Sequence, residues 1–172
     1  MNKDKYIEIF KKTGALLEGH FVLTSGRHSS SYFQCAKVLQ YPQYLSQFSK
    51  EIIKELSTEL EVDKVISPAV GGIVLGTEVG RLLNKPTIFA ERINGKMSLR
   101  RGFKIDKNEK ILVVEDVITT GGSVKEVIDV AHKNHGQVVG VGIIVDRSNG
   151  QVKIHENKKS LVSLKVESFS AD

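Results

Sequence analysis

Two adjacent acids followed by a glycine-rich turn form the most informative segment of the sequence. The apolar run Ile111–Val114 leads directly into Glu115 and Asp116, and the turn Thr119–Ser123 (TTGGS) comes three residues later. Small residues at the start of a helix expose several backbone N–H groups at the positive end of the helix dipole, which suits a phosphate. Two carboxylates beside a phosphate would repel it unless sugar hydroxyls or a cation lie between them. The segment therefore indicates a ligand that combines a phosphate with a ribose.

The same segment differs from the common nucleotide-binding motifs. The chain contains neither G-x-x-x-x-G-K-[ST] nor G-x-G-x-x-G at this turn, so a Walker loop and a dinucleotide fold are both excluded. An ordinary buried strand with an acidic end before a capped helix is the alternative interpretation of the segment.

The elements that must position these residues alternate between strands and helices. Short apolar runs predict strands at residues 64–67, 87–90, 111–114 and 138–145. Apolar residues at spacings of three and four predict helices from Pro42 to about residue 59, over 73–82, and from a capping box at Ser123–Glu126 to Gly136. This alternation predicts a parallel sheet with right-handed crossovers, in which ligands bind beyond the carboxyl ends of the strands.

The two ends of the chain add smaller elements. We expect an amphipathic helix over 3–13, and a hairpin with strands at 21–24 and 31–35 around a tip, Ser25–His28, that is rich in hydrogen-bond donors. Residues 151–168 are expected to add one or two edge strands. The segment Glu91–Gly102 concentrates cations between glycines with little apolar periodicity, and predicts a mobile loop or, alternatively, a solvated surface.

Composition limits the class of protein. The 172 residues, 40% hydrophobic and 26% charged, suit one globular domain. Cys35 is the one cysteine, so an intramolecular disulfide and a cysteine-rich zinc site are excluded, and a reducing cytoplasm is expected. No apolar run suits a signal peptide or a membrane span. The 25 basic and 20 acidic side chains give a net charge of +5, which favours anionic partners without choosing among them.

The acidic segment also resembles a known family. The run V-V-E-D-V-I-T-T-G-G-S (113–123) is similar to the phosphoribosyl pyrophosphate motif of type I phosphoribosyltransferases. Within that family, F-V-L-T-S-G-R-H-S-S-S-Y-F (21–33) and V-D-R-S (145–148) resemble the orotate phosphoribosyltransferases. The resemblance implies an α/β fold with a mostly parallel sheet flanked by helices, in a single domain over 1–172. Its parts would be an N-terminal hood (1–40), a core (41–150), and edge strands with the C-terminus (151–172).

The resemblance implies an activity and a set of site residues. Orotate and phosphoribosyl pyrophosphate would react, with Mg²⁺, to give orotidine monophosphate and pyrophosphate. Glu115 and Asp116 would hold the ribose hydroxyls and stabilise charge at the anomeric carbon. The 5-phosphate would be held by Thr119, Thr120, Gly121, Gly122 and Ser123. Further contacts to phosphoribosyl pyrophosphate would come from Val70, Gly71, Arg92, Lys96, Val117 and Ile118. Mg²⁺ would be held mainly by pyrophosphate, ribose and water, without direct protein ligands.

Base recognition and loop closure are implied in the same way. Thr119 and Arg147 would contact orotate, and the Arg147 guanidinium would bind the carboxylate that uracil lacks. The 92–102 loop would close over the site of the neighbouring subunit of a homodimer, with Lys96 as a catalytic residue that neutralises the leaving pyrophosphate. A surface arginine after a strand is the alternative for Arg147, and an ordinary strand-to-helix turn is the alternative for Gly71.

The sequence departs from the family pattern at several positions. Thr24 and Gly71 stand where lysines are common, and the loop has Ile93, Lys96 and Ser98 in place of K-x-x-K-x-H. These departures leave the pyrophosphate contacts open, and Arg100 or Arg101 would compensate. His20, His28 and Cys35 have no evident nucleophile or base partner and are interpreted as structural.

Two other functions are compatible with the fold. A purine phosphoribosyltransferase is disfavoured because a neutral purine offers Arg147 no carboxylate. A non-catalytic regulator that senses phosphoribosyl pyrophosphate and binds nucleic acid is permitted by the positive charge, but no recognition helix or aromatic platform is evident. We therefore expect neither nucleic acid nor a membrane as a partner.

Overall fold

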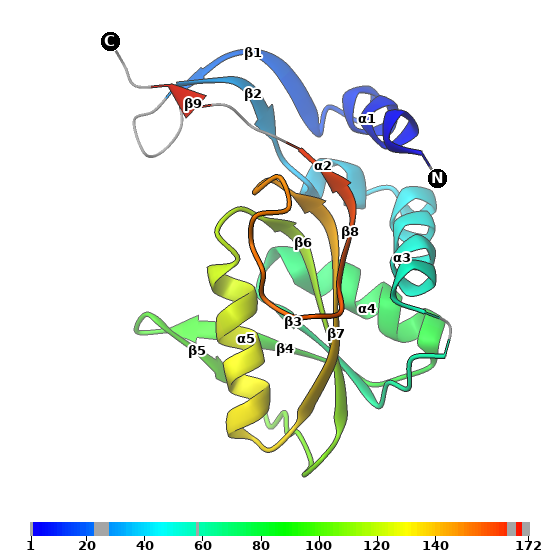
Figure 1. Ribbon diagram of the computed structural model, residues 1–172, viewed down its shortest axis with the longest axis vertical. Coiled ribbons are helices and arrows are strands. Elements are labelled where there is room, and N and C mark those ends of the chain that lie inside the picture. Colours follow the sequence, from blue (N-terminus) through cyan, green and yellow to red (C-terminus); the bar gives the residue numbers. More distant parts are fainter. Residues whose placement is uncertain (1, 23–27, 58, 165–167, 170–172) are drawn as a thin grey trace.

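The computed structural model describes residues 2–22, 28–57, 59–164 and 168–169, which form two sheets and five helices (Figure 1). The larger sheet has the strand order β5-β4-β3-β6-β7-β8. Its strands are β3 (Lys64–Pro68), β4 (Thr87–Ile93), β5 (Lys96–Leu99), β6 (Lys110–Ile118), β7 (Gln137–Asp146) and β8 (Lys158–Ser163). All neighbours are parallel except β5, which is antiparallel to β4. The predicted α/β class is confirmed.

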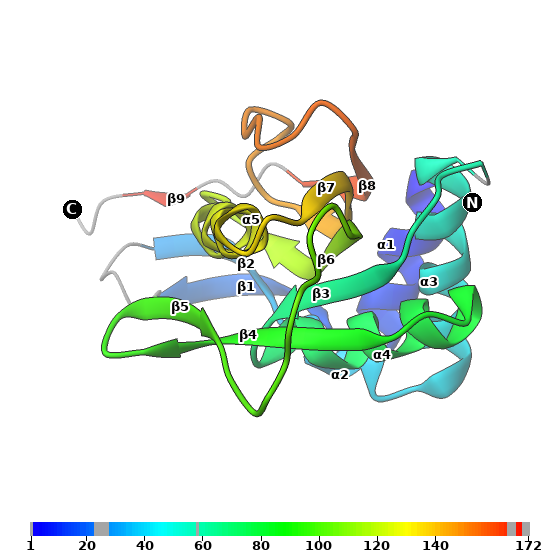
Figure 2. The ribbon, with the colours of Figure 1, turned by 90° about the horizontal axis from the view of Figure 1, so that it is seen from below.

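Helices cover both faces of this sheet. Helices α3 (Pro42–Leu56) and α4 (Gly71–Leu83) lie on one face, and α5 (Gly122–Lys133) lies on the other (Figure 2). Alternate residues of β6 point to opposite faces of the sheet. Leu112 and Val114 pack in the hydrophobic core with α3 and α4, whereas Ile111 and Val113 pack in the core with α5. Both faces of the strand are buried, which explains why its sequence is a continuous apolar run.

The N-terminal hood is a second, smaller sheet with one helix. Helix α1 (Lys3–Lys12) packs Tyr6 and Phe10 against Phe48 of α3, with ring centroids 5.6 and 5.8 Å apart. The sheet has the order β1-β2-β9, with β1 (Leu16–Val22), β2 (His28–Phe33) and β9 (Ser168–Phe169) all antiparallel. The chain then passes through a short helix, α2 (Ala36–Leu39), which the sequence patterns did not predict.

The limits of the hood hairpin differ from those predicted. Strand β1 begins at Leu16 rather than residue 21, because an irregularity between Glu18 and Phe21 interrupts the apolar alternation that marks a strand. Strand β2 begins at His28 and ends at Phe33. Most of the predicted donor-rich tip, together with Thr24, lies outside the described residues.

The basic segment is a β-hairpin and not the mobile loop that its composition predicts. Strand β4 continues to Ile93 and pairs with β5 through Arg92↔Met97 and Ile93↔Lys96. The two turn residues, Asn94 and Gly95, both have positive φ (47° and 80°), as a type I′ turn requires. The Asn-Gly pair was the signal for this hairpin, and the charge of the surrounding residues concealed it.

The start of α5 also corrects a prediction. The helix begins at Gly122 after the left-handed Gly121 (φ 73°), and no side chain caps it. Glu126, predicted to close a capping box with Ser123, is instead paired with Arg92 of β4. A guanidinium within reach is a stronger partner for this carboxylate than a backbone N–H.

The C-terminal part supplies two strands in different sheets. Strand β8 extends the large sheet in parallel beside β7, and β9 joins the hood beside β2. The predicted edge strands are therefore present, but the second belongs to the hood. Within the described part of the chain, no helix is long and apolar enough to cross a bilayer.

Candidate active site

The candidate site lies at the carboxyl ends of the parallel strands, where turns lead from β3 to α4, from β6 to α5, and onward from β7. Register brings these turns together, because Ile118 at the end of β6 pairs with Asp146 at the end of β7. The Arg147 backbone N–H then donates to the Ile118 carbonyl at 2.8 Å. Thr119 and Arg147, the two predicted orotate contacts, are the residues that come directly after this pair, so their backbones lie side by side.

The glycine-rich turn encloses a small polar cavity. Its volume is about 80 Å³, and it is lined by Glu115 and residues 117–124. Gly121 is required in this turn for two reasons: its φ is positive, and a Cβ there would lie 2.6 Å from Val152 Cγ1. The cavity opens at the N-terminus of the twelve-residue α5, as a phosphate cradle requires.

The hydroxyl residues of the turn all line this cavity. Thr119 and Thr120 are exposed there, and Ser123 in the first turn of α5 is partly exposed. The Thr120 hydroxyl accepts a hydrogen bond of 3.4 Å from the Gly122 backbone N–H, so it lies across the mouth of the helix. The structure thus brings the five predicted phosphate contacts to one cavity, and their role toward a ligand stays a prediction.

The acid pair borders this cradle. Glu115 is buried with 7% of its surface exposed, whereas Asp116 is partly exposed. Burial, and secondly the neighbouring Asp116 carboxylate, raise the pKa of Glu115 to about 9. Glu115 is therefore a neutral acid near pH 7, able both to donate and to accept hydrogen bonds.

The turn after β3 lies directly against the acids. A Cβ at Gly71 would lie 3.0 Å from both carboxylate oxygens of Asp116, and one at Gly72 would lie 3.0 Å from Glu115 Oε1. A side chain at either position would require these carboxyl groups to shift by a few tenths of an ångström. Val70, the N-cap residue of α4, is exposed beside them.

Arg147 is partly buried at the same edge of the sheet. Its Nε atom is buried and has no hydrogen-bond partner among the described residues. Burial lowers the pKa of the guanidinium, and the nearby Tyr32 phenol of the hood opposes that shift. An arginine held in this way between hood and core is available to an anionic ligand.

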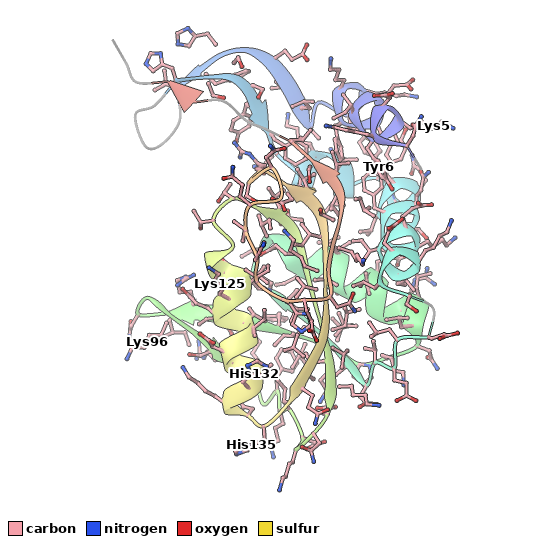
Figure 3. All side chains as sticks on the ribbon, viewed as in Figure 1. Lys5, Tyr6, Lys96, Lys125, His132 and His135 are labelled. Carbon is pink, nitrogen blue, oxygen red and sulfur yellow. The ribbon has the colours of Figure 1, made fainter. Side chains whose placement is uncertain are left out.

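The basic hairpin does not join this constellation within one chain. Both carboxylate oxygens of Glu126 lie within 2.9 Å of Arg92 Nη1, which also donates to the Gly95 carbonyl. Lys96 is exposed at the outer end of the hairpin (Figure 3) and borders a groove of about 540 Å³ against α5. Arg101 pairs with Glu91 and lies over the Phe89 ring.

The remaining candidate residues lie in or near the hood. His20 Nε2 and His28 Nδ1 are 2.7 Å apart, with His20 exposed and His28 partly exposed. Cys35 is buried, and burial, followed by the neighbouring acids Asp116 and Glu115, raises its pKa well above its usual value, so it is a neutral thiol. Within the described ranges, no three histidine, cysteine or acidic side chains cluster closely enough to hold a metal ion.

Several residues of the site were missed by sequence reasoning. Tyr32 approaches Arg147 from another sheet, Glu126 anchors Arg92, and Lys158 forms an ion pair with Asp146 at the end of β7. Only Asp146 gave a sequence signal, as an acid at the end of a buried strand. The others depend on contacts between elements that no local pattern reports.

Comparisons with known proteins agree with this geometry. A model of the phosphoribosyl transferase domain family matches residues 40–172. The orotate phosphoribosyltransferase of Chlorobium phaeobacteroides (strain BS1) is 57% identical over all 172 residues and 89% of its own length, and that of Desulforamulus reducens is 52% identical over 100% and 90%. A crystal structure of orotate phosphoribosyltransferase from Aeropyrum pernix, 26% identical, superposes with a TM-score of 0.76 over 92% of this chain and 93% of its own. The chain belongs to the orotate phosphoribosyltransferase family of phosphoribosyl transferases.

Proposed function

We propose that this protein transfers the phosphoribosyl group from phosphoribosyl pyrophosphate to orotate, giving orotidine monophosphate and pyrophosphate for pyrimidine synthesis. The observation that carries the proposal is the convergence of a phosphate cradle, an acid pair and an arginine without a partner among the described residues, all at one edge of the sheet. The names of the close relatives support orotate as the base. We expect the protein to act in the cytoplasm.

The cradle and the acids would hold the sugar phosphate. Backbone N–H groups and hydroxyls of residues 119–123 face the 5-phosphate, and Glu115 and Asp116 face the ribose hydroxyls. As the bond from the anomeric carbon to the pyrophosphate oxygen breaks and the bond to the orotate nitrogen forms, positive charge develops on the ribose. The Asp116 carboxylate, fixed beside that charge, stabilises the transition state.

Mg²⁺ suits this donor set. Mg²⁺ prefers oxygen ligands and keeps several waters, and it binds through substrate phosphates rather than through an all-protein cage. Asp116, partly exposed beside Gly71, offers oxygen atoms without closing a metal site. When bound, the ion would neutralise the charge of the leaving pyrophosphate.

Arg147 would select the base. Its fork of donors matches a carboxylate in a bidentate pair, and its partial burial strengthens that interaction. Thr119 lies beside it at the end of β6 and offers a hydroxyl to the pyrimidine. Neither uracil nor a purine provides the carboxylate, so both leave the guanidinium without its partner.

The pyrophosphate contacts would require a second subunit. Lys96 and Arg92 lie on a hairpin that projects from the sheet, and Arg92 is held by Glu126 of its own chain. We infer a homodimer in which the 92–102 segment reaches the partner's site, with Lys96 and Arg92 on the leaving group and Arg100 or Arg101 compensating for the family's missing basic residues.

Pyrophosphate release tests this assignment. The protein is incubated with Mg²⁺ and phosphoribosyl pyrophosphate, and orotate, uracil, hypoxanthine or adenine is added in turn. We expect turnover with orotate alone. Arg147→Ala should raise the KM for orotate roughly 30- to 100-fold, as expected for the loss of charged hydrogen bonds. Turnover with a purine would assign a purine enzyme instead. No turnover, together with salt-dependent binding to nucleic acid, would indicate the regulator.

A further inference from the structure

A buried ion pair lies one residue before the arginine that we assign to the substrate carboxylate. Lys158 Nζ, at the start of β8, is 2.7 Å from Asp146 Oδ2 at the end of β7. The Asp146 side chain is fully buried, and that of Lys158 is 13% exposed. Burying charges to this degree destabilises a protein unless each charge is paired and hydrogen-bonded. The two side chains are therefore held in one geometry.

Donors occupy both carboxylate oxygens of Asp146. The Ser148 hydroxyl and backbone N–H donate to Oδ1 at 2.5 and 2.8 Å, and Lys158 donates to Oδ2. Burial raises the pKa of Asp146, but the hydrogen bonds from Lys158 and Ser148 outweigh that effect and hold the pKa below its usual value. Asp146 is therefore a carboxylate whose charge is already matched.

The charge of the adjacent Arg147 guanidinium is not balanced in this way by any described residue. Arg147 forms no ion pair with any carboxylate in the part of the chain that the structure describes, although the nearest acid in sequence is its immediate neighbour. Arg147 is the first residue after β7, and Lys158 holds the Asp146 carboxylate on the side of β8. Without Lys158, a desolvated carboxylate and a desolvated guanidinium would remain as neighbours, and each would attract the other.

We infer that Lys158 is a positioning residue for base selection: by taking up the charge of Asp146, it keeps the Arg147 guanidinium free for the carboxylate of the substrate. The inference rests on the proposed function, because it takes Arg147 as the orotate contact. It assigns a role in specificity to a lysine of the edge strand β8, outside the segments that define the site.

Lys158 also contacts the segment that covers the cradle. Its Nζ atom donates to the Val152 carbonyl at 2.8 Å, and the Val152 side chain packs against Gly121. If Lys158 only supported this segment, replacing it would weaken the binding of phosphoribosyl pyrophosphate as much as the binding of orotate. The KM values for the two substrates separate the alternatives.

Lys158→Gln is the central variant, since its amide still donates a hydrogen bond to Asp146 but carries no charge. We expect the KM for orotate to rise on the order of tenfold, the size of a coupling between neighbouring groups, with kcat and the KM for phosphoribosyl pyrophosphate within about twofold. Lys158→Arg should retain the wild-type KM. In Asp146→Asn/Lys158→Gln neither charge remains, and the KM for orotate should return towards wild type.

A matched control is available at the opposite end of the sheet. Lys64 and Glu109 form an ion pair of 2.8 Å with side chains 11% and 14% exposed, at the amino end of β3. Lys64→Gln should leave both KM values unchanged, and thermal unfolding of every variant checks the fold.

Three results would overturn the inference: an unchanged orotate KM in folded Lys158→Gln, an equal rise in both KM values, or no recovery in the double variant. Arg147→Ala is measured in parallel. If that variant keeps the wild-type KM for orotate, the assignment of Arg147 fails instead, and with it the base-selection part of the proposed function.

Discussion

The surroundings of Glu115 change its acid–base chemistry strongly. Burial raises its pKa from 4.5 to about 9, so the folded protein binds this proton more tightly than the unfolded chain does. The resulting stabilisation is complete below pH 4.5 and is lost as the pH rises towards 9. Above that range, an uncompensated carboxylate would be buried beside Asp116.

Glu115→Gln tests this linkage. Between pH 5 and pH 9, the melting temperature of the wild type should fall relative to that of the variant. The fall should be roughly 3 °C for each kcal/mol of unfolding free energy that the wild type loses as Glu115 ionises. The exposed Glu156→Gln is the control and should follow the wild type. Parallel curves for the wild type and Glu115→Gln would contradict a neutral Glu115.

At the scale of elements, the turn before α5 depends on one glycine. Gly121→Ala introduces strain at φ 73° and places a Cβ 2.6 Å from Val152. We expect a loss of about 2–4 kcal/mol of stability, from backbone strain of ~1 kcal/mol and overpacking of 1–3 kcal/mol, and weaker binding of phosphoribosyl pyrophosphate.

Gly14→Ala separates these two contributions. Gly14 has a similar φ of 68°, but the nearest atom to its Cβ would be Lys37 Cδ at 4.0 Å. This variant should lose only the ~1 kcal/mol of backbone strain and keep its substrate affinity. Equal losses of stability in the two variants, measured by denaturant unfolding, would show that the Val152 contact is unimportant.

The anchor between α5 and the β4–β5 hairpin gives a further prediction. If Arg92 must leave Glu126 to reach pyrophosphate, Glu126→Gln should lower the KM for phosphoribosyl pyrophosphate by about two- to fivefold, the equivalent of an exposed ion pair. Glu78→Gln, which breaks the exposed pair with Arg81 on α4, is the matched control. An unchanged or higher KM in steady-state kinetics would mean that Arg92 does not leave Glu126.

For the whole molecule, the decisive question is whether two chains share each site. Lys96→Ala and Asp116→Asn should each be nearly inactive alone. If the hairpin of one subunit serves the other, mixing the two variants should restore activity, because each mixed dimer has one site with both residues intact. Random exchange would give about a quarter of the wild-type activity. No recovery, despite mixed dimers detected by native mass spectrometry, would place Lys96 in its own subunit's site.

Local patterns predicted much of the fold and the centre of the site. The buried runs at β6 and β7, the helical spacing of α3 and the turn at Thr119–Ser123 each depend on interactions within one element, so the sequence reports them directly. The predicted limits of the hood strands and the mobile loop predicted at 91–102 were wrong, because an irregular strand and a charged hairpin lack apolar alternation.

By itself the sequence determined the order of strands, glycine-rich turns and helices, the acids near the end of β6, and the cradle that follows it. The tertiary structure decided which of these side chains meet. Gly71 lies against Asp116 across 45 residues, Arg92 pairs with Glu126 across 34, and Lys158 neutralises Asp146 across 12. The physical reason is that periodicity encodes burial within an element, whereas contacts between elements depend on strand register and on the packing of the whole sheet.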